Sequence, residues 1–251
     1  MSVKHRMMKQ IRRFIGALGY EVRGTRYIPR PLLEPTNLRG VELDDLICRR
    51  MMETGRELTF IQVGAYDGIT RDPLRKYIER YGWRGVMLEP QAIAAGQLRA
   101  LYQNNDSVVI LQAALDRHPG TATLYAVDFG GREPSWAGGL ASFQRDCILK
   151  HRDLIPGLEG MIRCEEVACV TFDDVLARVP AEPLDLLQVD TEGADAYILS
   201  LFPFERIAPA IIHWEVKHLS MADRTSCLAR LAKLGYRFAP SGQEDMLAAR
   251  F

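Results

Sequence analysis

The chain has 251 residues, and its 32 Lys and Arg residues balance 32 Asp and Glu residues, which gives a formal net charge of zero. This balance excludes an overall positive field of the kind that attracts nucleic acid, so we expect no nucleic-acid partner. No apolar run approaches the roughly 20 residues that cross a bilayer. The five cysteines are an odd number without a Cys-x-x-Cys pair, which is typical of a reduced, cytoplasmic protein.

Residues 1–54 are predicted to form an N-terminal helical extension. Residues 1–23 are basic, and their apolar residues recur at helical spacing, at Met7, Ile11, Phe14, Ile15 and Leu18. Such a helix packs on its own domain, or it contacts a membrane surface or a partner. Prolines make residues 27–37 an irregular connector, and residues 43–54 predict a second helix that ends before Gly55. Residues 55–251 are predicted to form the main domain.

From residue 58 onward, short apolar strands alternate with helices of about ten residues. This alternation predicts βαβ units and an α/β fold with a seven-stranded, mostly parallel sheet flanked by helices. Residues 121–128 and a glycine-rich loop over 129–143 interrupt the rhythm, and the loop is either a lid or a plain excursion. The predicted strands are 58–65, 85–90, 108–115, 165–170, 184–190 and 208–216, with a closing pair at 236–240 and 245–251.

The first strand of this domain ends in a glycine turn, Gly64-Ala65-Tyr66-Asp67-Gly68. In an open parallel sheet, ligands bind beyond the carboxyl ends of the strands. Gly64 allows a sharp turn there, and Gly68 lets the backbone approach a ligand closely. We expect a helix to begin directly after the turn and to offer free N–H groups to a polar ligand group.

Glu89 ends the second strand, about 20 residues after the turn, where a carboxylate can accept hydrogen bonds from a ribose. The turn and the acid together predict a nucleoside-containing cofactor. The chain lacks a Gly-x-Gly-x-x-Gly motif, and Asp67 inside the turn would repel a pyrophosphate. An acidic turn instead suits the cationic amino acid part of S-adenosylmethionine. An NAD-type oxidoreductase is therefore the disfavoured alternative.

The chain resembles the FkbM-type methyltransferase family in the order and content of six segments between residues 58 and 238. The resemblance implies a class I methyltransferase-like (Rossmann-like) fold, S-adenosylmethionine as cofactor, and O-methylation of a hydroxyl on a sugar, glycan or glycosylated natural product. Tyr66 stands where family members often carry Asn. The segments are FIQVGAYDG (60–68), GVMLEP (85–90), LQAALDRHPGTATLY (111–125), VTFDDVL (170–176), LLQVDTEGAD (186–195) and IIHWEVKHL (211–219).

The resemblance also implies roles for individual residues. Glu89 would bind the ribose of the cofactor. The methionine part would contact Gly64, Tyr66, Asp67 and Gly68. The adenine would lie near Ala114, Leu115 and Asp116, and the transferred methyl group near Asp190, Glu192 and Gly193.

Methyl transfer to a hydroxyl needs a group that removes the proton or lowers the hydroxyl pKa. Asp190 and Glu215 each end an apolar strand. Two alternatives stay open: a carboxylate or a His acts directly as the base, or Asp190 and Glu215 bind a divalent cation such as Mg²⁺. His213 lies inside a strand, which is more typical of a core residue, and Lys217 is placed to orient a polar substrate. We expect the catalytic residues to be Asp190, Glu192, Glu215 and His218.

The identity of the acceptor and the oligomeric state stay open at this stage. A further alternative also stays open, a non-catalytic scaffold that keeps the methyltransferase fold. Methyl transfer that survives an Asp190→Ala substitution would exclude Asp190 from the catalytic site.

Overall fold

The computed structural model of the chain describes residues 20–23, 26–29, 41–130, 140–179 and 183–250. The predicted N-terminal helix, most of the connector and most of the lid candidate lie outside these residues. Residues 20–23 and 27–29 were predicted as the end of the helical stretch and the start of a loop, but they belong to strands β1 (Tyr20–Arg23) and β2 (Arg26–Pro29), which pair antiparallel. A two-stranded sheet consists of edge strands alone, and edge strands tolerate a proline such as Pro29.

The main sheet has seven strands in the order β12-β13-β11-β10-β3-β4-β5. Neighbouring strands from β11 to β5 run parallel, whereas β13 is antiparallel to both β11 and β12. The predicted seven-stranded, mostly parallel sheet is therefore confirmed. Its strands are β3 (Thr59–Val63), β4 (Arg84–Leu88), β5 (Val108–Leu111), β10 (Leu186–Val189), β11 (Ile211–Glu215), β12 (Arg237–Ser241) and β13 (Asp245–Ala249).

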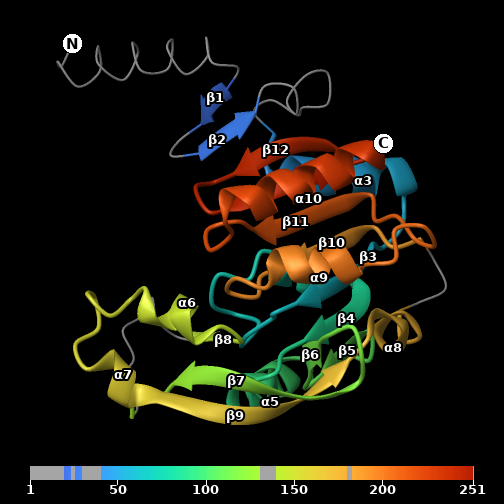
Figure 1. Ribbon diagram of the computed structural model, residues 1–251. Coiled ribbons are helices and arrows are strands. Elements are labelled where there is room, and N and C mark those ends of the chain that lie inside the picture. Colours follow the sequence, from blue (N-terminus) through green and yellow to red (C-terminus); the bar gives the residue numbers. More distant parts are fainter. Residues whose placement is uncertain (1–19, 24–25, 30–40, 131–139, 180–182, 251) are drawn as a thin grey trace, which may run out of the picture.

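Helices cover both faces of this sheet, and Figure 1 shows α9 and α10 in front of it and α3 behind it. Because side chains alternate along a strand, Phe60 and Leu186 pack into the core on the α3 side, while Ile61 and Leu187 pack into the core on the α10 side. One face holds α3 (Leu43–Thr54), α4 (Arg75–Tyr81) and α5 (Ala92–Leu101), and the other holds α8 (Phe172–Leu176), α9 (Asp195–Leu201) and α10 (Met221–Lys233).

Local capping signals fix two helix ends where the sequence predicted them. Helix α3 ends at Thr54 because Gly55 adopts a left-handed φ of 62° and donates its N–H to the Met51 carbonyl. Helix α8 begins after Thr171, whose side chain accepts from the Asp174 N–H while the Asp174 carboxylate accepts from the Thr171 N–H.

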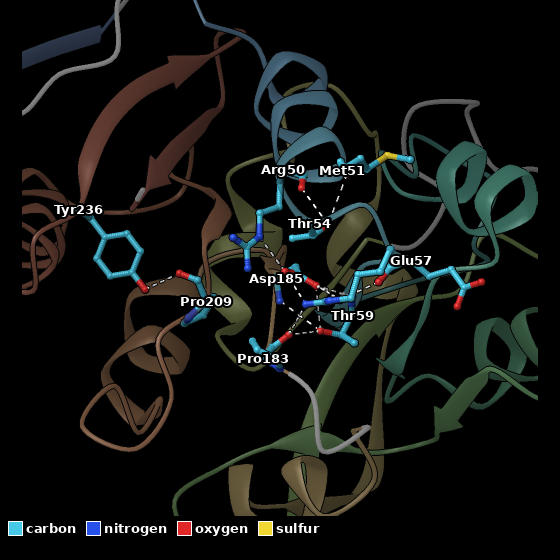
Figure 2. A network of polar contacts seen from close by, with 10 residues as sticks. Arg50, Met51, Thr54, Glu57, Thr59, Pro183, Asp185, Pro209 and Tyr236 are labelled. Carbon is cyan, nitrogen blue, oxygen red and sulfur yellow. Dashed lines mark hydrogen bonds and ion pairs between the residues drawn. The ribbon is translucent and has the colours of Figure 1, made fainter.

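A buried carboxylate ties α3 to the sheet (Figure 2). Asp185 directly precedes β10 and is completely buried. Its two oxygens accept from the Arg50 and Arg56 side chains, at 2.8 Å each, and from the Thr59 backbone N–H at 2.9 Å. Helix α3, the segment before β3 and the amino end of β10 therefore share one charged contact.

A second sheet, of four strands in the order β6-β9-β7-β8, lies along the lower part of Figure 1. It corrects two predictions. Residues 108–115 form two strands, since the chain leaves the main sheet after Leu111 and enters the second, and residues 165–170 pair within this second sheet. An apolar run does not reveal which sheet it joins. The strands are β6 (Ala114–Leu115), β7 (Gly120–Val127), β8 (Ala141–Ser142) and β9 (Ile162–Val170). Two short helices, α6 (Arg145–Leu149) and α7 (Leu158–Met161), lie between β8 and β9 in the chain.

Within the described residues, no helix combines the length and the apolar character that crossing a bilayer requires.

Candidate active site

A cavity of about 670 Å³ opens beyond the carboxyl ends of β3, β4, β10 and β11, and the second sheet forms part of its wall. In the part of the chain that the structure describes, four predicted site residues do not line this cavity, namely Asp67, Gly68, Gly193 and His218. The structure therefore brings most of the predicted residues together from separate segments. Those that line the cavity are Gly64, Tyr66, Glu89, Ala114, Leu115, Asp116, Asp190, Glu192 and Glu215.

The two glycines of the turn are required by neighbouring protein atoms. Gly64 has a φ of 80°, and a Cβ there would lie 1.7 Å from the Asp190 carbonyl oxygen. Gly68 has a φ of 70°, and a Cβ there would lie 2.5 Å from a methyl group of Leu98 on α5. Both positions thus need glycine for backbone conformation and for packing. Their contact with a ligand stays a prediction.

The acids around the turn hold backbone groups of the turn itself. Asp67 accepts from the N–H groups of Ile69 and Thr70, at 2.8 and 2.7 Å, and from the Thr70 hydroxyl at 2.7 Å. The prediction that a helix with free N–H groups begins directly after the turn was wrong, because α4 begins only at Arg75. Asp72 accepts from the N–H groups of Leu74 and Arg75, at 2.6 and 3.0 Å, so these groups are occupied.

Glu89 braces the turn from the next strand. It is 3% exposed, its Oε2 accepts from the Tyr66 N–H at 2.8 Å, and its Oε1 accepts from the Gln91 N–H at 2.9 Å. Tyr66 has a left-handed φ of 48°, a strained conformation for a residue with a side chain, and this hydrogen bond helps to hold it. Burial raises the pKa of Glu89. The Gln91 side chain also hydrogen-bonds to this carboxylate. A carboxylate has about four lone-pair sites, so Glu89 can still accept from a ligand hydroxyl in the cavity.

Asp116 lies at another part of the cavity wall, after β6. Its Oδ1 accepts from the Arg117 N–H at 2.6 Å and from the hydroxyl of Tyr197 on α9. Ala114 and Leu115 just before it are each 5% exposed. This end of the cavity therefore pairs an apolar floor with one carboxylate, which suits a flat aromatic group bearing hydrogen-bond donors.

Three acids lie within six residues after β10, two in the loop that follows the strand and the third, Asp195, at the first position of α9. Asp190 is exposed to the cavity, whereas Asp195 is completely buried and accepts from the N–H groups of Thr191 and Gly193, both at 3.2 Å. Asp195 therefore shapes the loop that presents Asp190 and Glu192. Sequence reasoning did not single it out, although an acid in the first turn of a helix was the available signal.

These acids differ in pKa because of their surroundings. Desolvation of its carboxylate by the surrounding protein is the largest effect on Asp190, followed by repulsion from Asp195 and Glu192. Together they raise the pKa of Asp190 well above its ordinary value. Burial, and then repulsion from Asp190 and Glu192, raises the pKa of Glu215 to about 10. Burial also acts to raise the pKa of Glu192, but His218 beside it outweighs burial, and the net shift is downward. At neutral pH, Glu215 is therefore protonated and Glu192 is ionised.

Three polar side chains form a row across the middle of the sheet, just inside the cavity. Gln62, Gln188 and His213 are in register on β3, β10 and β11, and all three are buried. Gln188 Oε1 lies 2.6 Å from His213 Nδ1. Gln62 Nε2 donates to Asp72 at 3.4 Å, while its buried Oε1 has no hydrogen-bond partner among the described residues. Sequence reasoning missed both glutamines, since each sits in an otherwise apolar strand.

Glu192, Glu215 and His218 form a compact cluster in which one ligand atom of each lies within 4.8 Å of the others. His218 Nε2 is 3.0 Å from Glu192 Oε2 and 3.9 Å from Glu215 Oε2. The sequence analysis considered Asp190 and Glu215 as a metal-binding pair. Among the described residues, the structure instead groups Glu215 with Glu192 and His218, and Asp190 lies outside this cluster.

Several solved methyltransferases resemble the chain at low sequence identity. The FkbM methyltransferase of Methylobacillus flagellatus KT is 12% identical with a TM-score of 0.46, over 77% of this chain and 44% of that chain. The N-terminal domain of human METTL16, solved in complex with SAH, is 8% identical with a TM-score of 0.42, over 83% and 67% of the two chains. The precorrin-6y C5,15-methyltransferase of Geobacter metallireducens GS-15 is 10% identical with a TM-score of 0.41, over 88% and 98%.

The present chain thus spans less than half of the Methylobacillus chain. No curated protein matches the sequence. The family profile of the Methyltransferase FkbM domain, however, matches residues 62–238, which is more than half of the chain. This match and the order of the seven strands confirm the predicted class I methyltransferase-like fold. The chain belongs to the FkbM methyltransferase family.

Proposed function

We propose that the protein is an S-adenosylmethionine-dependent O-methyltransferase that acts on a hydroxyl of a sugar, a glycan or a glycosylated natural product. The observation that carries this proposal is the cavity at the strand ends of a methyltransferase domain, with Glu89 in one wall and Asp190 in another. Its volume of about 670 Å³ lies within the roughly 300–1,000 Å³ range of small-molecule sites.

The residues of the cavity fit a nucleoside that carries positive charge. Glu89 would accept hydrogen bonds from the ribose, and the floor at Ala114 and Leu115 with Asp116 would hold the adenine. The acids near Asp190 would favour a cationic sulfonium centre and an ammonium group. When bound, the cofactor supplies an electrophilic methyl group, whose bond to sulfur breaks with the electron pair staying on sulfur.

Asp190 is the best-placed general base. It faces the cavity, and its raised pKa makes it a stronger base than an ordinary Asp. It would take the hydroxyl proton as the acceptor oxygen bonds to the methyl carbon. Glu215 with a pKa of about 10 already holds its proton at neutral pH, and the lowered pKa of Glu192 makes it a weaker base.

The polar row supports an acceptor with several hydroxyl groups. Gln62, Gln188 and His213 offer amide and imidazole groups at the floor of the cavity, where water is largely excluded. Gln62 Oε1 is a buried acceptor that a hydroxyl could satisfy. Lys217 also lines the cavity and forms an ion pair with Glu244 at 3.2 Å, so it is placed to orient a polar group.

The arrangement argues against the NAD-type alternative. A dinucleotide site presents a helix N-terminus directly to the pyrophosphate. In this chain α4 begins only at Arg75, Asp72 occupies its first N–H groups, and Asp67 adds a second carboxylate beside the turn. A pyrophosphate here would meet negative charge in place of free donors.

Calorimetric titration of the full chain with S-adenosylmethionine, S-adenosylhomocysteine and NADH tests the proposal. We expect the first two to bind one molecule per chain and NADH to give no heat. Absence of binding by both sulfur ligands would contradict the proposal. Release of S-adenosylhomocysteine in the presence of a panel of glycosylated acceptors then tests turnover. Cofactor binding without turnover on any hydroxylated acceptor would favour the non-catalytic scaffold.

A further inference from the structure

We propose that Glu192, Glu215 and His218 bind a divalent first-row transition metal ion in the wall of the cavity. Their ligand atoms form a triangle with sides of 3.0 Å, 3.9 Å and at most 4.8 Å. An ion at the centre of this triangle would lie about 2.0–2.4 Å from each atom, close to the roughly 2.0–2.2 Å of imidazole and carboxylate ligands. The three atoms are thus spaced for one ion without a change of backbone.

Two of the three side chains are buried without a hydrogen-bond partner at the atom that faces the cluster. Glu215 is 7% exposed and the His218 side chain 6%, and neither Glu215 Oε2 nor His218 Nε2 forms a hydrogen bond with a described residue. His218 Nε2 and Glu192 Oε2 are only 3.0 Å apart, yet they are not aligned as donor and acceptor. Burying such groups unsatisfied is costly, and a shared cation would satisfy all three.

The scaffold around the cluster is fixed by other residues. Glu215 ends β11, which is paired on both sides, by β10 and β13. Glu192 has a left-handed φ of 51°, and its carbonyl oxygen accepts from the Ser142 hydroxyl at 3.0 Å. Ligands held in this way need little reorganisation to bind an ion. One imidazole with two carboxylates suits Mn²⁺, Fe²⁺ or Zn²⁺ better than Mg²⁺, which prefers oxygen ligands alone.

The cluster opens on one side to the cavity, because Glu192 and Glu215 both line it. An ion with three protein ligands keeps coordination positions for a ligand from that side. If the proposed function holds, the acceptor hydroxyl is the group that would reach it, and an ion there would lower the pKa of this hydroxyl before its proton passes to Asp190. Metal binding itself does not depend on that function.

Titration of the EDTA-treated full chain with Mn²⁺, followed by electron paramagnetic resonance and without cofactor, tests the inference. We expect one Mn²⁺ per chain, displaced by Zn²⁺. Glu215→Gln and His218→Asn should each weaken binding by at least about tenfold. Glu244→Gln is the matched control, because Glu244 lines the same cavity outside the cluster, and it should bind Mn²⁺ within twofold of the unchanged chain.

Circular dichroism of each variant establishes that it is folded before binding is measured, and either cluster variant alone suffices if the other does not fold. Absence of both Mn²⁺ and Zn²⁺ binding, or unchanged binding in a folded cluster variant, would overturn the inference. The proposed function is tested by a separate result: it is contradicted if S-adenosylmethionine does not bind even when Mn²⁺ does. Full methyl transfer in EDTA by a chain that binds no metal would support the function and refute the metal site.

Discussion

The two ends of strand β10 carry the same residue type in opposite situations. Asp185 precedes the strand and is completely buried, with two arginines and a backbone N–H donating to its oxygens. Asp190 follows the strand and forms no hydrogen bond with a described residue through its carboxylate, while Glu192 and Asp195 repel it. Figure 2 shows the first of these carboxylates surrounded by its partners.

This difference suggests that Asp185 contributes to stability and Asp190 to reactivity. A buried carboxylate with a full set of donors has a fixed charge and a fixed position, so it joins structural elements. Carboxylates crowded together with few donors have shifted pKa values and keep lone pairs for a proton, a cation or a substrate. We therefore infer that the amino end of β10 is a structural anchor, and we propose that its carboxyl end is the reactive one.

The largest effect is expected at the reactive end. Asp190→Asn removes the proposed base while keeping its size, so kcat should fall by about 10²–10⁴-fold. In the unchanged enzyme kcat should fall as the pH drops through the raised pKa of Asp190, above the ordinary range of an Asp, and this acid limb should be missing in the variant. Steady-state kinetics over a pH series measures both. A kcat within threefold of the unchanged enzyme would exclude Asp190 as the base.

A substitution of Asp185, the structural anchor, should change the stability of the protein. Asp185→Asn leaves Arg50 and Arg56 without their anionic partner, which should lower the free energy of unfolding by about 2–4 kcal/mol; the arginines are partly exposed and recover some hydration. Urea unfolding measures the change. Asp173→Asn is the control, because Asp173 forms an exposed ion pair with Arg206 and should change stability little. Equal effects of the two substitutions would contradict the assignment of Asp185 as an anchor.

Substitution of Glu215 should change stability by a smaller amount and in the opposite direction, because it should stabilise the protein. Its pKa is about 10 in the folded chain against an ordinary value of 4.5, so the folded state binds this proton more tightly and stability is lost as pH rises from 4.5 toward 10. Gln carries no such proton, and Glu215→Gln should therefore stabilise the metal-free protein at pH 8 by about 1–3 kcal/mol. Thermal unfolding in EDTA at pH 5 and pH 8 measures this. A variant less stable than the unchanged chain at pH 8 would refute it.

The sequence predicted those features that depend on local signals. Helix α3 ends at Thr54 because of Gly55, and α8 begins with the Thr171–Asp174 capping box, since both signals act within four residues. The acids at strand ends reach the cavity because parallel strands bring their carboxyl ends to one edge.

Features that depend on partners far along the chain could not be predicted. Asp185 is separated from Arg50 and Arg56 by 135 and 129 residues, and no local pattern connects them. The row of Gln62, Gln188 and His213 exists only because three strands are in register. Helix α4 begins only at Arg75, and Asp72 accepts from the N–H groups of Leu74 and Arg75, a role that its spacing from the glycine turn did not distinguish from ligand binding.

The contact between Asp185 and α3 bears on where an autonomous folding unit can begin. The predicted division at residues 54 and 55 would detach Arg50 and would strip from the back of the sheet the apolar side chains of Leu43, Leu46 and Ile47, which pack into its core. A fragment starting at Gly55 would thus expose a hydrophobic surface and keep a half-neutralised buried anion. We therefore expect the smallest independently stable unit of this chain to include helix α3, although that helix precedes the region matched by the family profile.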